Sequence, residues 1–253
     1  MDIRRLTAPN PGPFTLDGTQ TYLLGNTAVL DPGPAIEEHI AAILDAQPGL
    51  TTILITHRHG DHAPAAVPLR AKTGAKVYAP RNVLDDTSVD VRLAGGEQLV
   101  IDGETLEVIA TPGHTNEHVC FLTKDGGLFT GDTVLGTGTT AIFPPDGHMG
   151  DYLRSLATLR ARNPRRIYPA HGPIREDAVA LIDEYIAHRL LREEQILAAI
   201  AAGDTTMTQM RTRIYPDLDE RLHRAAEIQL TAHLIKLREE GRVPPGEWNR
   251  SET

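Results

Sequence analysis

The chain has 253 residues, of which 40% are hydrophobic and 23% are charged, and its formal net charge at pH 7 is -9. This length and apolar content support one sizeable hydrophobic core with room for a small second domain, and they exclude a largely disordered chain. The acidic balance excludes a protein that binds nucleic acid through an overall excess of Lys and Arg, although it leaves room for a local basic pocket.

The cysteine content limits disulfides and metal ligands, and the N-terminal sequence bears on where in the cell the protein is found. Cys120 is the only cysteine, so no intrachain disulfide forms and nitrogen and oxygen atoms would hold any metal. The prolines within residues 1–14 oppose the helix of a signal or transit peptide. No segment approaches the run of about 20 apolar residues that spans a membrane. We therefore expect a soluble, cytoplasmic protein, and the sequence is also compatible with a homo-oligomer.

Up to about residue 175, short apolar or β-branched runs alternate with Gly/Pro turns and helical stretches, which is typical of a mixed α/β domain. The pattern predicts strands over Thr21–Leu24, Ala28–Leu30, Thr52–Thr56, Lys76–Tyr78, Leu106–Ala110, Val119–Thr123, Leu128–Thr130 and Arg166–Tyr168. The spacing of apolar residues predicts helices over Ala35–Asp45, Ala63–Lys72 and Tyr152–Arg160.

The pattern changes after Gly172 and becomes helical. Apolar stripes predict a long helix through Ile182–Ile200, a short amphipathic helix over Thr206–Ile214, a second long helix through Leu222–Leu237, and a candidate β wing from Val243 onward. This order resembles a small winged-helix unit. We predict a first domain over residues 1–180 and a winged-helix-like domain over residues 181–253.

The segment THRHGDHA, Thr56–Ala63, holds a dense group of metal-ligand side chains. His57 and His59 lie two residues apart at the end of a predicted buried strand, so both imidazoles point to the same side. Gly60 lets the chain turn, after which Asp61 and His62 can reach a second position. Four potential ligands are more than one zinc ion usually takes from so short a segment. Because charged imidazoles repel one another and the group has no packing use, the segment predicts a metal site.

Three further predicted strands each deliver one His or Asp beside a glycine: His114 in TPGHT, Asp132 in TGDT and His171 in PAHG. Loops at strand ends are where α/β architectures build their sites. With the first cluster, these residues complete a set of seven candidate ligands.

The motifs THRHGDH, TPGHT, TGDT and PAHG resemble the ordered motifs of the metallo-β-lactamase fold superfamily. The resemblance implies an αββα sandwich of the α/β class. It also implies the ligands: His57, His59 and His114 for one metal, Asp61, His62 and His171 for a second, and Asp132 between them. Two Zn²⁺ suit this mixture of imidazole and carboxylate, although Mn²⁺ or Fe²⁺ would also accept it.

A narrower resemblance covers nearly the whole chain. PNPGPFTLDGTQTYLLG, GDTVLGTGTT, IYPAHGPI and YIAHRLLREEQIL are similar to the beta-lactamase-like protein 2 family, which carries a C-terminal winged-helix extension. Arg58 stands where family members commonly have Trp. The resemblance implies a metallohydrolase whose substrate is either an ester or thioester, as in glyoxalase II-like enzymes, or single-stranded RNA. The alternative is a non-hydrolytic regulatory or nucleic-acid-binding protein on the same scaffold.

Two metal ions a few ångströms apart can share a hydroxide that attacks the scissile bond near neutral pH. We expect Asp61 to orient this nucleophile as well as to bind metal. Three residues are candidates for supporting roles: Asp31 for holding a ligand loop, His118 for supporting the loop of His114 or Asp132, and His188 for facing substrate.

Overall fold

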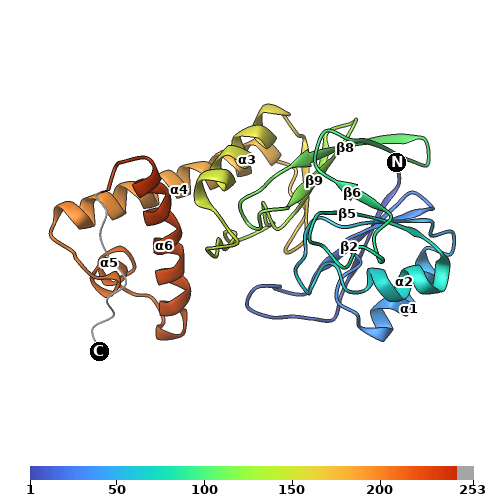
Figure 1. Cartoon of the computed structure of the whole chain (residues 1–253), viewed down its shortest axis with the longest axis horizontal. Helices are drawn as coiled ribbons and strands as arrows, with labels where there is room; N and C mark the ends of the chain where they lie inside the picture. Colours follow the sequence, from blue (N-terminus) through green and yellow to red (C-terminus); the bar gives the residue numbers. More distant parts are fainter. Residues whose placement is uncertain (244–253) are drawn as a thin grey trace.

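The computed structural model describes residues 1–243 and shows two β-sheets packed face to face, with helices outside them and a helical unit at the C-terminal end (Figure 1). This arrangement confirms the predicted αββα sandwich followed by a small helical domain.

The first sheet has the strand order β1-β2-β3-β4-β5-β6. Its strands are β1 (Ile3–Thr7), β2 (Gln20–Leu24), β3 (Ala28–Leu30), β4 (Thr52–Leu54), β5 (Lys76–Pro80) and β6 (Val91–Leu93). Strands β3, β4, β5 and β6 pair with one another in parallel, whereas β2 pairs antiparallel with both β1 and β3. Helices α1 (Glu37–Ala46) and α2 (Ala66–Thr73) cover the outer face of this sheet.

The second sheet has the order β11-β10-β9-β8-β7. Its strands are β7 (Gln98–Ile101), β8 (Glu104–Ala110), β9 (Val119–Thr123), β10 (Gly127–Gly131) and β11 (Arg166–Pro169). Only the pairing of β10 with β11 is parallel in this sheet. Helices α3 (Met149–Ala161) and α4 (Ala178–Ala201) lie on its outer face.

Alternation along the strands divides the core between the layers. In β9, Phe121 points into the cluster between the two sheets, whereas its neighbour Cys120 packs under α3 and α4. In β4, Leu54 likewise faces the other sheet and Ile53 faces α1 and α2. Successive side chains on a strand point to opposite faces, so both faces of each sheet are buried.

All eight strands and all three helices predicted for residues 1–175 are present, but strands β1, β6 and β7 were not predicted. They are short, and in β1 the charged Arg4 and Arg5 are exposed, which hides the apolar alternation. The strand predicted to reach Thr56 ends at Leu54, because the Thr56 N–H donates to the side chain of Asp31. Helix α3 begins earlier than predicted, at Met149, since the His148 side chain accepts a hydrogen bond from the Asp151 N–H at the helix start.

The C-terminal unit contains α5 (Met207–Ile214), the 3-10 helix η1 (Glu220–Leu222) and α6 (His223–Glu239). Figure 1 shows α5 and α6 set apart from the sandwich and joined to it by the long helix α4. The predicted wing lies outside the described residues, apart from Val243. No helix in residues 1–243 combines the length and apolar character needed to cross a bilayer.

Helix α4 runs through the predicted boundary at residue 180. Its first turns pack Ile182 and Tyr185 against the second sheet, whereas Ile196 and Ala199 pack with α5 and α6. One continuous helix therefore contributes to both cores, and the exact division at residues 180 and 181 stays a prediction.

Candidate metal centre

The seven predicted ligands lie on loops that follow strands of both sheets. Four of them, His57, His59, Asp61 and His62, follow β4. His114 follows β8, Asp132 directly follows β10, and His171 follows β11. Gly131 makes the close approach of these loops feasible: its φ is 47°, and a Cβ there would lie 2.7 Å from both His118 Nε2 and Thr56 Oγ1.

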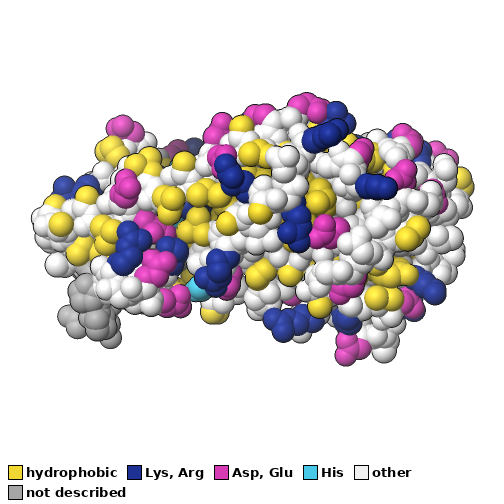
Figure 2. Space-filling view, turned by 90° about the horizontal axis from the view of Figure 1, so that it is seen from above, with side chains coloured by type: hydrophobic (Ala, Val, Ile, Leu, Met, Phe, Trp, Pro, Cys, Tyr) yellow, Lys and Arg dark blue, Asp and Glu magenta, His cyan; other side chains and the backbone are white. Residues whose placement is uncertain are grey.

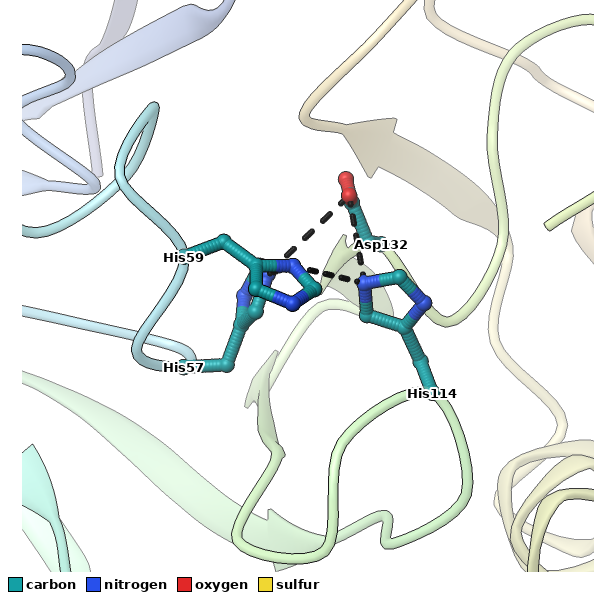
Figure 3. A group of neighbouring side chains, drawn as sticks. All are labelled: His57, His59, His114 and Asp132. Carbon is teal, nitrogen blue, oxygen red and sulfur yellow. Dashed lines mark hydrogen bonds and ion pairs between the residues drawn. The ribbon is translucent and has the colours of Figure 1, made fainter. Parts of the chain in front are cut away.

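Three imidazoles and one carboxylate converge in the first group of ligand atoms (Figure 3). His59 Nδ1 lies 3.0 Å from His57 Nε2 and 3.0 Å from His114 Nε2. Asp132 Oδ2 lies 3.5 Å from His114 Nε2 and 4.0 Å from His57 Nε2. Figure 3 shows these four side chains pointing toward one another, with His57 and His59 on one loop and His114 and Asp132 on others.

The second group consists of Asp61, His62 and His171. Asp61 Oδ2 lies 3.2 Å from His171 Nε2 and 3.4 Å from His62 Nε2. The other oxygen of Asp132, Oδ1, lies 3.3 Å from His171 Nε2 and 3.5 Å from His62 Nε2. One carboxylate thus places an oxygen in each group, which is the arrangement of a bridging ligand.

Three buried ligand atoms lack hydrogen-bond partners among the described residues: His62 Nε2 and His171 Nε2 of the second group, and Asp132 Oδ1, which lies beside them. An unpaired buried polar atom is costly, and these three point at one position. A divalent cation would satisfy all of them at once. The donor set, imidazole nitrogens with carboxylate oxygens, also fits zinc.

Four of the histidines have their other ring nitrogen beside an oxygen atom. His57 Nδ1 lies 2.9 Å from Thr56 Oγ1, and His62 Nδ1 lies 2.9 Å from Asp31 Oδ2. His114 Nδ1 lies 2.8 Å from the Ala141 carbonyl and His171 Nδ1 lies 3.4 Å from the Gly18 carbonyl. Oxygen acceptors at these positions fix the ring orientation and leave the converging nitrogen available as a ligand.

The electrostatics of the cluster keep its carboxylates ionised. Burial raises the pKa of Asp61 and Asp132, but the nearby charges of His62 and His171 outweigh burial and lower both pKa values well below the usual range. Burial and neighbouring imidazoles lower the pKa of His57, and they bring the pKa of His59 to about 4. For His62, burial lowers the pKa, but Asp132, Asp31 and Asp61 raise it well above its ordinary value. Neutral His57 and His59 and anionic carboxylates are the protonation states that metal binding requires, whereas His62, which the carboxylates around it keep protonated, would release a proton when a metal binds.

Two of the predicted supporting residues contact the ligand loops. The buried Asp31 carboxylate accepts hydrogen bonds from the Thr56 N–H and the Thr56 hydroxyl, both at 2.8 Å, and faces His62 Nδ1. His118 Nε2 accepts from the Asp132 N–H at 3.3 Å, while its Nδ1 lies 2.9 Å from Thr111 Oγ1. Burial and adjacent histidines lower the pKa of His118 well below its ordinary value, which leaves the ring neutral and able to accept.

The structure does not bring His188 to the cluster. It lies on α4, half-buried beside Arg189 and Arg192, and does not line the cavity described below. The sequence placed it on the same helix as other motif residues, but the rotation of α4 directs it toward the C-terminal helices, where His233 is a neighbour.

Three supporting side chains were not predicted from the sequence: Thr56, Glu117 and Asp146. Thr56 links the two ligand groups. Its hydroxyl faces His57 Nδ1 of the first group and donates to Asp31, which faces His62 of the second group. Glu117 accepts from the Arg58 N–H at 3.2 Å and pairs with the Arg58 guanidinium at 2.8 Å, while Asp146 pairs with the same guanidinium at 2.6 Å. Arg58 therefore ties the loop between His57 and His59 to Glu117 and Asp146. The only sequence signal for Glu117 is its place in the loop that carries His114.

The cluster forms the floor of a cavity of about 500 Å³, which His59, Asp61, His114 and Asp132 line at the bottom. Its walls are mostly apolar, and no Lys or Arg is among the described residues that line it. Ligand sites of this size are typically apolar with a few convergent polar groups.

Comparison with known proteins agrees with this geometry. Residues 15–171 match the Metallo-beta-lactamase superfamily, and residues 206–246 match the Beta-lactamase associated winged helix domain. The chain is 35% identical to the Beta-lactamase-like protein 2 homolog of Caenorhabditis elegans, over 95% of this chain and 85% of that protein. It is 29% identical to an atrochrysone carboxyl ACP thioesterase of Cryptosporiopsis sp. (strain 8999), over 95% of this chain and 81% of that protein.

Among solved structures, a metallo-beta-lactamase family protein from Thermus thermophilus superposes with a TM-score of 0.77. The two chains are 26% identical, and the match covers 97% of this chain and 96% of the other. The similarity therefore includes the C-terminal unit as well as the sandwich.

Proposed function

Because the chain belongs to the metallo-β-lactamase superfamily and joins its sandwich to the associated winged-helix domain, we propose that it is a dinuclear zinc hydrolase of esters or thioesters. The observation that carries the proposal is the pair of ligand groups that share Asp132 at the floor of one apolar cavity.

The residues present fit two metal ions. His57, His59 and His114 would hold one ion, and Asp61, His62 and His171 the other, with one oxygen of Asp132 toward each. When bound, such a pair of divalent ions lowers the pKa of water and polarises the scissile carbonyl.

The side chain of Asp61 is the candidate for handling the nucleophilic water. It lines the cavity, is partly exposed there, and stays ionised because neighbouring histidines lower its pKa. We infer that its carboxylate orients water by accepting a hydrogen bond from it. In the overall reaction the oxygen of water bonds to the carbonyl carbon, the C–S or C–O bond breaks, and the departing thiolate or alkoxide receives a proton.

The charge distribution favours an ester or thioester over single-stranded RNA. Phosphodiester backbones are held by Lys and Arg, and the described cavity lining contains neither. The Arg58 guanidinium is engaged by Glu117 and Asp146. On the face shown in Figure 2, Lys and Arg side chains are interspersed with acidic and apolar ones. The thioesterase named among the relatives supports the same choice.

A parallel assay tests the proposal. The zinc-loaded full chain is incubated with a thioester, an aryl ester, a lactone, a phosphodiester and a single-stranded RNA. We expect turnover of the thioester or ester, and its loss in His59→Ala. The matched control is His188→Ala, a histidine outside the cluster, which should keep wild-type turnover. Cleavage of RNA alone would reject the substrate class, and DNA binding without hydrolysis of any substrate would favour a regulatory protein.

A further inference from the structure

The cavity above the metal-ligand cluster has walls from three segments that lie far apart in the sequence. Pro13, Phe14 and Leu16 come from the loop before β2, and Leu135 to Phe143 come from the loop after β10. The third wall belongs to the C-terminal unit, from Tyr215 to Gln229. The sandwich alone would leave this side open.

The walls are apolar and partly open to solvent. Phe14 and Phe143 meet edge to face, with ring centroids 6.2 Å apart, across one side of the cavity. Leu218 and Leu222 of the C-terminal unit also line the cavity. Phe14 is 66% exposed and Leu222 is 50% exposed, so two of the large exposed apolar side chains among the described residues stand at one cavity. Exposed apolar groups gathered in this way mark a binding surface.

The C-terminal wall is fixed to the metal-ligand loops. The Gln229 side-chain amide on α6 accepts from the Ile142 N–H at 3.2 Å and donates to the Ile142 carbonyl at 2.9 Å. The buried Arg189 on α4 donates to the Thr140 carbonyl at 2.5 Å. The intervening Ala141 carbonyl faces His114 Nδ1 at 2.8 Å. The wall is therefore held at a defined distance from the cluster.

We propose that this cavity binds the apolar acyl group of the substrate, and that the C-terminal unit, through Leu222 and Ala225, sets the acyl length that the enzyme prefers. The proposal rests on the proposed function. The carbonyl would lie at the floor beside Asp61 and Asp132, and the chain would extend between Phe14 and Leu222. A lining without Lys or Arg suits an uncharged acyl chain, whereas it offers no counterion to a phosphate or carboxylate.

The experiment uses two series of N-acetylcysteamine compounds with the zinc-loaded full chain. Thioesters with acetyl, butyryl, hexanoyl and octanoyl groups report kcat/KM, and the S-alkyl thioethers of matching length report binding without hydrolysis. Burial of each methylene should raise kcat/KM and thioether affinity about fourfold until the cavity is filled.

Two variants test the wall itself. Ala225→Phe should shorten the preferred chain, so that the ratio of octanoyl to acetyl kcat/KM falls about tenfold or more. Leu222→Ser should lower octyl thioether affinity about fivefold to tenfold. Leu190→Ser, which changes a leucine 45% exposed on α4 outside the cavity, should change neither. Circular dichroism of each variant confirms that it folds.

The outcomes separate the two proposals. Flat dependence of kcat/KM and thioether binding on chain length would overturn the acyl-site proposal while hydrolysis itself stands. Length-dependent thioether binding without hydrolysis of any thioester or ester would overturn the proposed function and keep the apolar site. A length dependence that Leu222→Ser and Ala225→Phe leave intact would overturn the role of the C-terminal wall.

Discussion

Replacement of Asp31 by Asn tests whether the second ligand group depends on a buried carboxylate behind it. Asp31 is fully buried, and its Oδ2 lies 2.9 Å from His62 Nδ1. An Asn side chain keeps one oxygen for the Thr56 N–H but presents an NH₂ donor on its other side. If that donor faces His62, the ring must carry its proton on Nε2, the nitrogen that points at Asp61 and Asp132. The metal would then lose a ligand.

The expected magnitude follows from this contact. Removal of the carboxylate behind a metal-binding histidine typically costs 10-fold to 100-fold in metal affinity, which is about 1.4 to 2.7 kcal/mol. Asn is preferable to Ala because the backbone φ of Asp31 is 46°, a left-handed conformation that Asn tolerates. We therefore expect Asp31→Asn to weaken one of two zinc equivalents and to leave the other unchanged.

The assay is zinc competition against a chromophoric chelator, which reports the two equivalents separately. Asp102→Asn is a matched control, because Asp102 has a φ of 48° and its carboxylate also accepts from a backbone N–H, that of Asn26, and a threonine hydroxyl, that of Thr27. If Asp31→Asn bound both zinc equivalents with unchanged affinity, the proposed role of Asp31 behind His62 would be refuted. An equal loss of zinc affinity in Asp102→Asn would refute it as well.

The other predictions concern the first ligand group, the link to the C-terminal unit, and a buried charge. His59→Ala should bind one zinc equivalent fewer with little change in the melting temperature of the metal-free protein; full metal content by elemental analysis would contradict it. Gln229→Ala removes two hydrogen bonds to Ile142 and should lower the free energy of unfolding by about 1 to 3 kcal/mol in urea titrations, with no loss expected in Gln98→Ala on an edge strand. Burial raises the pKa of Glu193, but His233 and Lys236 outweigh burial and lower it to about 2, so its contribution to stability is present above its unfolded pKa of about 4.3 and is lost as the pH falls toward 2. Glu193→Gln should therefore flatten the loss of thermal stability across that pH range, and an unchanged acid profile would argue against this assignment.

The seven candidate ligands could be predicted from the sequence because metal ligation needs particular side chains at fixed spacing. Two histidines at period two after a buried strand, with a glycine and further donors behind them, carry their geometry in local sequence, as do His114, Asp132 and His171 at the ends of other strands. The helices were equally predictable where an apolar stripe is long, as in α4 and α6. Short edge strands such as β7, with exposed Gln98 and Val100, gave no such signal.

Only the tertiary structure decides which partners stand behind the ligands and what covers them. The Ala141 carbonyl behind His114 is a backbone atom without a sequence signature, and Glu117 meets Arg58 because two loops cross. The apolar cavity joins Phe14, Phe143 and Leu222, which no local periodicity relates. The packing of whole layers brings such distant segments together, and Leu222 lines the same cavity as Phe14 because α4 joins the C-terminal helices to the sandwich.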